Sequence, residues 1–442
     1  MGVFKPQLLL LLSFLIWVFF YLQVDVTYLY DGSFLFPIST LISFIAFFLI
    51  GIYSLKSKSV RSIPKASDKK VKQIIYTLFV LGGLGVLLKI YSGYFNSGIF
   101  AASDIFDQRI ENMNKEFTGG FTGLIGSILF PFSVVSMLIG LYNYKKIKNN
   151  FLIIIVLFGC YPFVETVFMG GRTIFALLGT TIIFTLYSSF VKNKTFKLTK
   201  LIYKNKVVIS FPSFLKKKKI IIPLTLLAVL FISYSISIVS ERLERFDYGN
   251  KVFEIWEKKE YRWIEFDKSF KKEYYRSEDE QKATMIGLHS LNHYFAHGVF
   301  EYVRLVNHLE KTTGYYYGMY EFYTFFKFFR ALGIPVPSKF EMSEIIDRQA
   351  VYRTFWGEFY IDFGVLGIVI MFFWGRFTKS IYIYATRQHT EYVVFYAYLS
   401  TIVITSFFIN FLLGSSSYYL FAFLITLLIF KIWPQNIKFV LK

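Results

Sequence analysis

The chain has 442 residues, of which 55% are hydrophobic, 21% aromatic and only 18% charged. Its formal net charge is +20, and it holds a single cysteine. These numbers exclude an ordinary soluble domain, a disulfide framework and a cysteine-based zinc site. The positive charge does not indicate nucleic acid, because most of the lysines stand in short connections between apolar stretches, where they set topology and meet anionic lipid headgroups.

Ten apolar stretches of roughly 18 to 25 residues predict transmembrane helices, since in hydrocarbon only helices or closed barrels satisfy their own backbone. Barrel strands are about ten residues long and alternate in polarity, which these stretches do not. The predicted spans are 6–23, 33–54, 73–92, 119–143, 150–168, 172–191, 220–239, 357–375, 392–411 and 415–433. The first lacks a small-x-small cleavage site and is predicted to be a retained helix. The expected fold class is an all-α polytopic integral membrane protein.

Three parts follow from these spans. Residues 1–239 hold the first seven helices, residues 240–356 form a large and mostly helical loop, and residues 357–442 hold the last three helices. The large loop carries 18 basic and 18 acidic side chains. A loop of this length is unusual unless it has a function.

The short connections predict the orientation. Those at 55–72, 144–149, 192–219 and 376–391 carry seven, three, ten and three Lys or Arg residues, and with ten spans all four lie on one side. The connection 93–118 lies on the other side and holds two basic residues against four carboxylates. By the positive-inside rule, the basic side and both termini are cytoplasmic. The large loop is then extracytoplasmic.

Residues Gln281 to Lys311 read as one amphipathic helix. At 100° per residue, six titratable or charged side chains fall within one arc of about 120°. They are His289, His293, His297, Glu301, Arg304 and His308. Three interpretations stay open for this face. It is a solvated surface, a zinc site of histidines at i and i+4, or a cavity wall where a neutral imidazole accepts a proton and an arginine holds an anion. The zinc site lacks further ligands in the sequence.

Two arginine clusters flank the predicted outer surface. Arg172 stands in a Gly-Gly-Arg turn between the fifth and sixth spans, as a topological anchor or a ligand contact. The second cluster, residues 347–364, leads into the eighth span and contains Arg348, Arg353 and Glu358. Glu358 and Asp362 share a helix face at i and i+4. A structural arginine–carboxylate pair is the alternative to a ligand site there.

At these residues the chain resembles the Wzy-type O-antigen and capsule repeat-unit polymerases. The resemblance covers the architecture of many spans with one dominant late loop, the Gly-Gly-Arg turn at 170–172, and the spacings R-x10-G and R-x15-G from Arg353 and Arg348 to Gly364. It implies polymerisation of undecaprenyl-pyrophosphate-linked repeat units on the outer face of the bacterial cytoplasmic membrane. It also implies contact with membrane lipids, with a chain-length regulator and with a flippase.

The chemistry of that reaction suits the residue types present. Forked guanidinium donors bind a pyrophosphate leaving group and stabilise its charge; the candidates are Arg172, Arg304, Arg348 and Arg353. The sugar hydroxyl needs a general base, for which His297 is the first choice, His293 the second and Glu358 the carboxylate alternative. No metal or other cofactor is expected, because the Asp-x-Asp pair of metal-dependent transferases is missing from the sequence.

Two other functions remain open. A related O-antigen ligase has a similar layout and transfers finished glycan to another acceptor. A transporter or flippase of lipid-linked glycan would place charged residues in the middle of several spans, whereas Lys89 and Glu165 stand near the outer ends of theirs.

Overall fold

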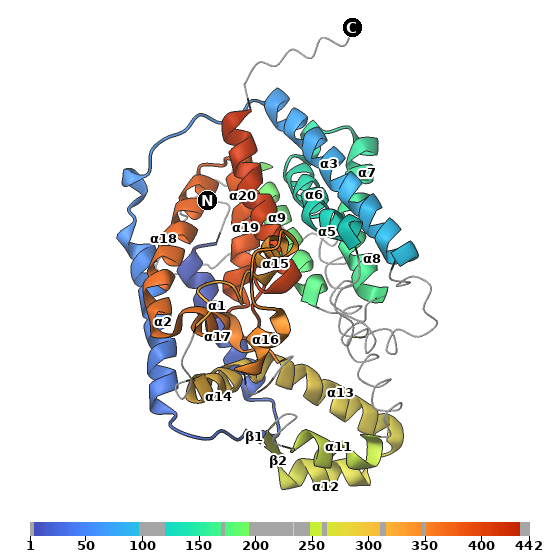
Figure 1. Ribbon diagram of the computed structural model, residues 1–442, viewed down its shortest axis with the longest axis vertical. Coiled ribbons are helices and arrows are strands. Elements are labelled where there is room, and N and C mark those ends of the chain that lie inside the picture. Colours follow the sequence, from blue (N-terminus) through green and yellow to red (C-terminus); the bar gives the residue numbers. More distant parts are fainter. Residues whose placement is uncertain are drawn as a thin grey trace, which may run out of the picture.

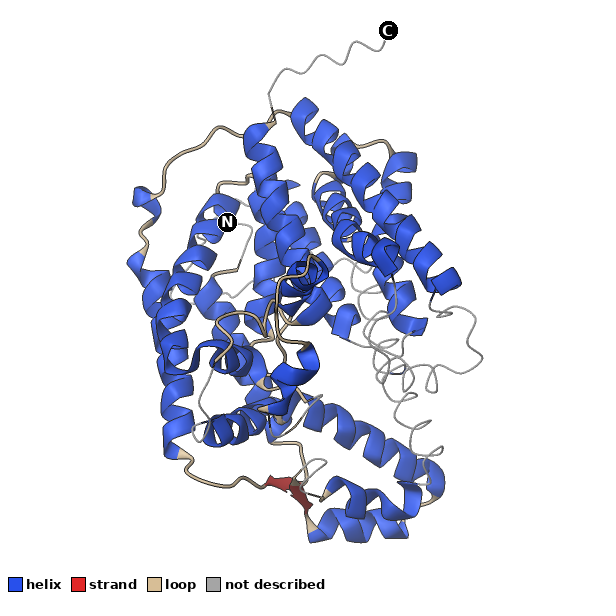
Figure 2. Ribbon diagram, viewed as in Figure 1, coloured by secondary structure: helices blue, strands red, loops and turns tan. Residues whose placement is uncertain are grey.

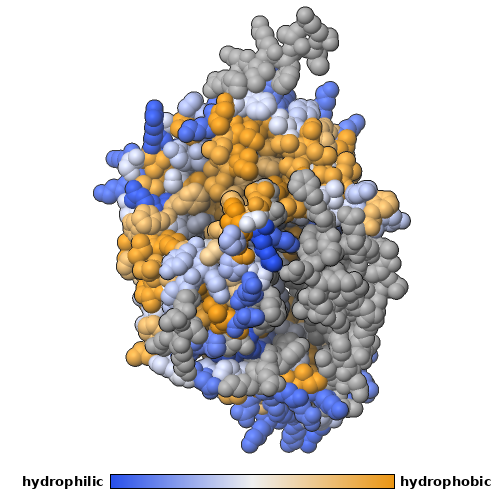
Figure 3. Space-filling view, in the orientation of Figure 1, coloured by the Kyte–Doolittle hydropathy of each residue, from blue (hydrophilic) through white to orange (hydrophobic). Residues whose placement is uncertain are grey.

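Helices make up most of the computed structural model, which describes residues 4–96, 120–168, 173–193, 233, 248–258, 263–309, 315–346, 348 and 351–433. Long apolar helices form a bundle, and a smaller group of elements closes one end of it as a cap (Figures 1 and 2). We use "cap" for β1, β2 and helices α11 to α13. On the face drawn in Figure 3, apolar side chains cover the bundle, and hydrophilic side chains gather at the cap end.

The N-terminal half of the chain supplies most of the bundle. Its elements are α1 (Pro6–Tyr21), β1 (Val26–Tyr28), α2 (Leu35–Ser54), η1 (Ser57–Ser59), α3 (Asp68–Tyr91), η2 (Ser92–Asn96), α5 (Gly120–Leu129), α6 (Pro131–Tyr142), η3 (Tyr144–Lys146), α7 (Asn149–Gly159), α8 (Tyr161–Phe168) and α9 (Thr173–Asn193).

The C-terminal half contributes the rest of the cap and returns to the bundle. Its elements are α11 (Tyr248–Trp256), β2 (Ile264–Phe266), α12 (Lys268–Arg276), α13 (Asp279–Ala296), α14 (Gly298–Leu309), α15 (Tyr323–Ala331), α16 (Lys339–Glu344), α17 (Thr354–Phe363), η4 (Gly364–Leu366), α18 (Gly367–Thr386), α19 (Thr390–Ile404), η5 (Gly414–Ser416) and α20 (Ser417–Ile432).

Seven helical stretches among the described residues are long and apolar enough to cross a membrane. They are Leu35–Ser54, Asp68–Phe95, Thr122–Tyr142, Asn149–Thr166, Thr173–Lys192, Thr354–Thr386 and Gly414–Ile432. Two shorter apolar helices are Pro6–Tyr21 and Thr390–Ile404. The predicted span 220–239 lies outside the described residues, and the other predicted spans fall on these helices. The fold is therefore that of a helical membrane protein, as the composition predicted.

The predicted eighth span is wrong in its bounds. Residues 354–363 form the separate helix α17, the backbone of Gly364 takes a positive φ of 53°, and α18 continues to Thr386. The predicted connection 376–391 is consequently mostly helical. Helix α18 packs closely along α2. A Cβ added to Gly375 would collide with the Phe48 carbonyl of α2, and one added to Gly51 would collide with the Phe372 carbonyl of α18. Small residues allow such a close approach of two membrane helices.

Three of the basic connections, 55–72, 144–149 and 376–391, lie at the end of the bundle away from the cap (Figure 1), and most of the fourth, 192–219, lies outside the described residues. Arg387 donates to the backbone carbonyls of Ser57, Val60 and Arg61, and the Lys146 ammonium lies 2.6 Å from an Asp68 carboxylate oxygen. These connections, far apart in sequence, thus lie at the same end of the bundle.

Candidate functional site

The cap joins the first connection of the bundle to the predicted large loop. Strand β1, between α1 and α2, pairs antiparallel with β2, so that Tyr28 stands opposite Ile264. Side chains from both strands and from α11 to α13 bury a small core around Phe253 and Trp256. Beyond position 298, buried residues such as Val299 and Tyr302 join the main core of the bundle, while Phe300 still packs against the cap core. The predicted loop 240–356 is thus divided between the cap and the bundle.

Three histidines form a column along α13. The ring centroids of His289 and His293 lie 6.1 Å apart, and those of His293 and His297 lie 4.8 Å apart with 10° between the ring planes. These residues are 3%, 4% and 5% exposed. The expectation of a solvated face is therefore wrong. Phe266 covers His289 at 4.8 Å and Tyr28 covers His293 at 5.6 Å, so the cap removes the column from water.

The predicted single helix over residues 281–311 is also wrong, because the chain turns at His297 between α13 and α14. The His297 ring donates from Nδ1 to the His293 carbonyl oxygen at 2.7 Å. At Gly298, a Cβ would lie 3.1 Å from the Phe407 carbonyl oxygen of the segment after α19. This turn carries α14 into the bundle, where Tyr302 hydrogen-bonds Thr40 of α2 at 2.7 Å.

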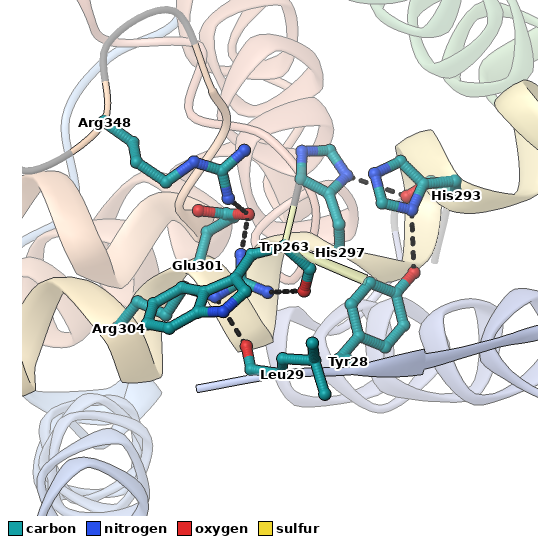
Figure 4. A network of polar contacts seen from close by, with 8 residues as sticks. All are labelled: Tyr28, Leu29, Trp263, His293, His297, Glu301, Arg304 and Arg348. Carbon is teal, nitrogen blue, oxygen red and sulfur yellow. Dashed lines mark hydrogen bonds and ion pairs between the residues drawn. The ribbon is translucent and has the colours of Figure 1, made fainter. Parts of the chain in front are cut away.

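One buried carboxylate holds two of the predicted arginines (Figure 4). An oxygen of Glu301 accepts from Arg304 Nη1 and, at 2.5 Å, from Arg348 Nη1. The glutamate is 3% exposed and Arg304 is 2% exposed. A carboxylate is rarely buried so deeply unless it is paired and hydrogen-bonded. The stacked His297 and His293 stand one and two turns before Glu301, so five buried polar side chains follow one another along α13, α14 and the segment of Arg348.

Arg304 uses its remaining donors on the backbone. Its Nε donates to the Leu29 carbonyl and its Nη2 to the Trp263 carbonyl, each at 2.8 Å, and its guanidinium lies 5.0 Å from the centre of the Trp263 ring. Leu29 follows β1 and Trp263 precedes β2. Arg304 therefore connects α14 to the ends of both strands of the small sheet.

Two further predicted residues, Arg353 and Glu358, lie in a second cluster at α17. The Arg353 guanidinium lies 3.9 Å from the Glu358 carboxylate, and both side chains are buried. Asp362, one turn further, accepts from the backbone N–H groups of Tyr320 and Glu321 at 3.0 and 2.9 Å. The predicted i,i+4 pair of carboxylates is thus present, with the second used to hold a neighbouring loop.

Glu321 belongs to this second cluster and was missed from the sequence. Both of its carboxylate oxygens accept from the Asn410 amide, at 2.8 and 2.9 Å. Complete burial, with Glu358 nearby, raises the pKa of Glu321 well above its ordinary value. Asn410 lies in the non-helical segment between α19 and η5, where it is buried inside the protein.

The structure explains why position 364, the glycine of the R-x10-G spacing, is a glycine. Its φ of 53° favours glycine, and an added Cβ would lie 2.6 Å from the Tyr315 ring. It ends α17 and so places Arg353 and Glu358 beside α14 rather than along α18.

Arg172 lies outside the described residues, but its neighbour in sequence does not. The Thr173 hydroxyl lies 2.8 Å from the Tyr352 hydroxyl, and the Tyr352 ring lies 6.5 Å from that of His297. The start of α9 therefore meets the histidine column through Tyr352.

Tyr28 and Trp263 are further site residues that the sequence reasoning missed. The alternating Val-Thr-Tyr of residues 26–28 was the available signal for a short strand. The pairing of this strand with Ile264–Phe266, more than two hundred residues away, has no local signal. Among the described residues there is no group of three or more His, Cys, Asp or Glu side chains placed to hold a metal ion.

Comparisons with known protein families, with curated proteins and with solved structures find no match for this chain.

Proposed function

We propose that the protein is a membrane glycosyltransferase that elongates a polyprenyl-pyrophosphate-linked glycan at the cap end of the bundle. One arrangement carries this proposal: the stacked imidazoles of His293 and His297 stand two turns and one turn before Glu301, Glu301 holds Arg304 and Arg348, and all five residues are buried. Buried titratable groups with specific charged neighbours mark functional sites. Imidazole and guanidinium are also the groups that this transfer needs, as a base for a hydroxyl and as donors to a diphosphate.

The residues take different roles in this reaction. His297 is the general base for the acceptor hydroxyl, with His293 beside it. Arg348 and Arg353 bind the departing pyrophosphate. Arg304 is assigned to positioning, because its Nε, Nη1 and Nη2 atoms all hold protein groups. Glu358 orients Arg353. The transfer of a sugar from its diphosphate needs no other energy source, since the bond to the leaving group supplies it.

We further infer that the protein crosses a bacterial cytoplasmic membrane ten times, with both termini inside and the cap outside. The gathering of basic connections away from the cap supports this orientation. Reporter fusions at the connection 55–67 and at α12 test it directly, because the two positions must report opposite sides. Undecaprenyl-pyrophosphate-linked repeat units are the proposed substrate, and a flippase and a chain-length regulator are the proposed partners.

The proposed reaction is tested with purified protein in lipid vesicles and lipid-linked oligosaccharide extracted from cells that carry the gene. We expect a ladder of longer glycans without ATP, and loss of the ladder in His297→Gln and Arg348→Gln. Transfer of whole glycan to a different lipid acceptor would indicate a ligase. Movement of the lipid across the vesicle wall without elongation would indicate a transporter and overturn the proposal.

A further inference from the structure

Tyr28 reaches the histidine column from β1 (Figure 4). Its hydroxyl lies 3.1 Å from Nδ1 of His293. Its ring stacks on Phe300 with centroids 4.1 Å apart and 6° between the planes. The register of β1 on β2 fixes its backbone opposite Ile264. Tyr28 is therefore held along its backbone and its ring, and its hydroxyl is aimed at one ring nitrogen.

The chemistry of the two groups decides which one donates. A phenol hydroxyl donates strongly and accepts weakly, because its lone pair is delocalised into the ring. The unprotonated nitrogen of a neutral imidazole is a good acceptor. Tyr28 O–H therefore donates to Nδ1 of His293, and the neutral His293 ring carries its proton on Nε2.

His297 has the opposite arrangement. Its Nδ1 lies 2.7 Å from the His293 backbone carbonyl oxygen, which can only accept. The proton of neutral His297 therefore sits on Nδ1, and its lone pair is on Nε2. The two rings are stacked at 4.8 Å. Neighbouring imidazoles of the histidine column thus hold opposite tautomers.

We propose that Tyr28 is a positioning residue that fixes His293 as its Nε2–H tautomer, so that the stacked pair offers one proton donor and one proton acceptor. The use made of the pair rests on the proposed function. Nε2 of His297 takes the proton of the acceptor-sugar hydroxyl while that oxygen bonds to the anomeric carbon. The bond from the anomeric carbon to the pyrophosphate oxygen breaks, its electron pair leaves on the pyrophosphate, and His293 Nε2–H donates a hydrogen bond to that oxygen.

The tautomers are measured directly on the full chain in lipid nanodiscs, with histidine labelled by 15N. Protonated and bare imidazole nitrogens differ widely in 15N chemical shift, and His293→Gln assigns the His293 signals by removing them. The spectra are recorded at about pH 8.5, above the ordinary pKa of histidine. We expect His293 to be Nε2–H in the wild type. In Tyr28→Phe its Nδ1–H form should rise about fivefold, the effect of one lost hydrogen bond.

Tyr28→Phe keeps the ring on Phe300, so the cap core stays filled. Tyr21→Phe is the matched control, because the Tyr21 ring packs on the same Phe300 at 5.5 Å. The control should leave the His293 signals unchanged. A wild-type His293 that is Nδ1–H, or populations that do not change in Tyr28→Phe, would overturn the assignment. The spectrum needs no substrate, so it decides the tautomer even if the elongation assay fails.

The role in catalysis has its own readout. Tyr28→Phe should lower kcat at least fivefold and leave KM for the lipid-linked donor within about twofold, because the variant changes the tautomer of His293 and not the groups that bind the donor. Tyr21→Phe should change neither constant. A shifted tautomer with an unchanged kcat would overturn the positioning role.

Discussion

Replacing Glu301 by glutamine tests the polar network on which the candidate site depends. The substitution keeps the size of the side chain and removes one negative charge. In the wild type that charge faces two guanidinium groups, and the three side chains are 1% (Arg304), 7% (Arg348) and 3% (Glu301) exposed. The variant leaves two buried cations facing a neutral amide.

The magnitude follows from the burial. Removing one partner of a buried ion pair destabilises a protein by about 3–5 kcal/mol. The glutamine oxygen still accepts one hydrogen bond, and Arg304 keeps its contacts to the Leu29 and Trp263 carbonyls. We therefore expect the lower end, a loss of about 3 kcal/mol in the free energy of unfolding. Adding Arg348→Gln should recover about 1–2 kcal/mol of this loss, because one uncompensated charge is removed.

The assay is unfolding of the purified protein in mixed micelles by titration with a denaturing detergent, with linear extrapolation. Asp279→Asn is the control. It removes a carboxylate that pairs with Lys282 on α13 but is 99% exposed, and such a pair contributes at most about 1 kcal/mol. If Glu301→Gln loses no more stability than Asp279→Asn, the network does not hold α14 and Arg348 together and our assignment of the site fails.

Four further outcomes are expected. Gly364→Ala should lose about 1–3 kcal/mol in the same titration, since φ is positive and Tyr315 is close; an unchanged midpoint would contradict this. Glu165→Gln should lower the folded yield in size-exclusion chromatography, because the Lys89 ammonium lies 2.6 Å from that carboxylate, whereas Lys89→Met with Glu165→Leu should restore it. Burial raises the pKa of Glu321, so the stabilising contribution of its protonated form is full below the ordinary pKa and is lost as the pH rises through the raised value. The wild type should therefore lose stability relative to Glu321→Gln from pH 4.5 upward. A stability difference that does not depend on pH would refute this. His297→Gln should lower kcat of elongation about 10²–10⁴-fold, and a normal rate would exclude it as the base.

The positions of the histidines show where sequence reasoning reached its limit. A helical wheel gives the angles between side chains on one helix, and His289, His293 and His297 do share a face. It does not say which face is covered. The covering residues, among them Phe266 and Tyr28, come from strands on other parts of the chain. Burial of the column therefore depends on a pairing that no local pattern encodes.

The arginine predictions divide in the same way. Guanidinium chemistry singled out Arg304 and Arg348 from the sequence, and the structure brings both to Glu301. The sequence could not separate their environments, because the donors of Arg304 are occupied by the backbone at residues 29 and 263, far away along the chain.

The sequence by itself indicated a helical membrane protein whose short connections are basic. The length of an apolar stretch and the lysines that flank it are local properties, and they act on the lipid bilayer separately for each segment. Only the tertiary structure decided that α13 and α14 are separate helices, that the histidines are buried and that Tyr28 meets them. The contact between Tyr28 and His293 joins residues 265 apart in sequence, and such contacts are set by how the whole chain packs rather than by any one stretch of it.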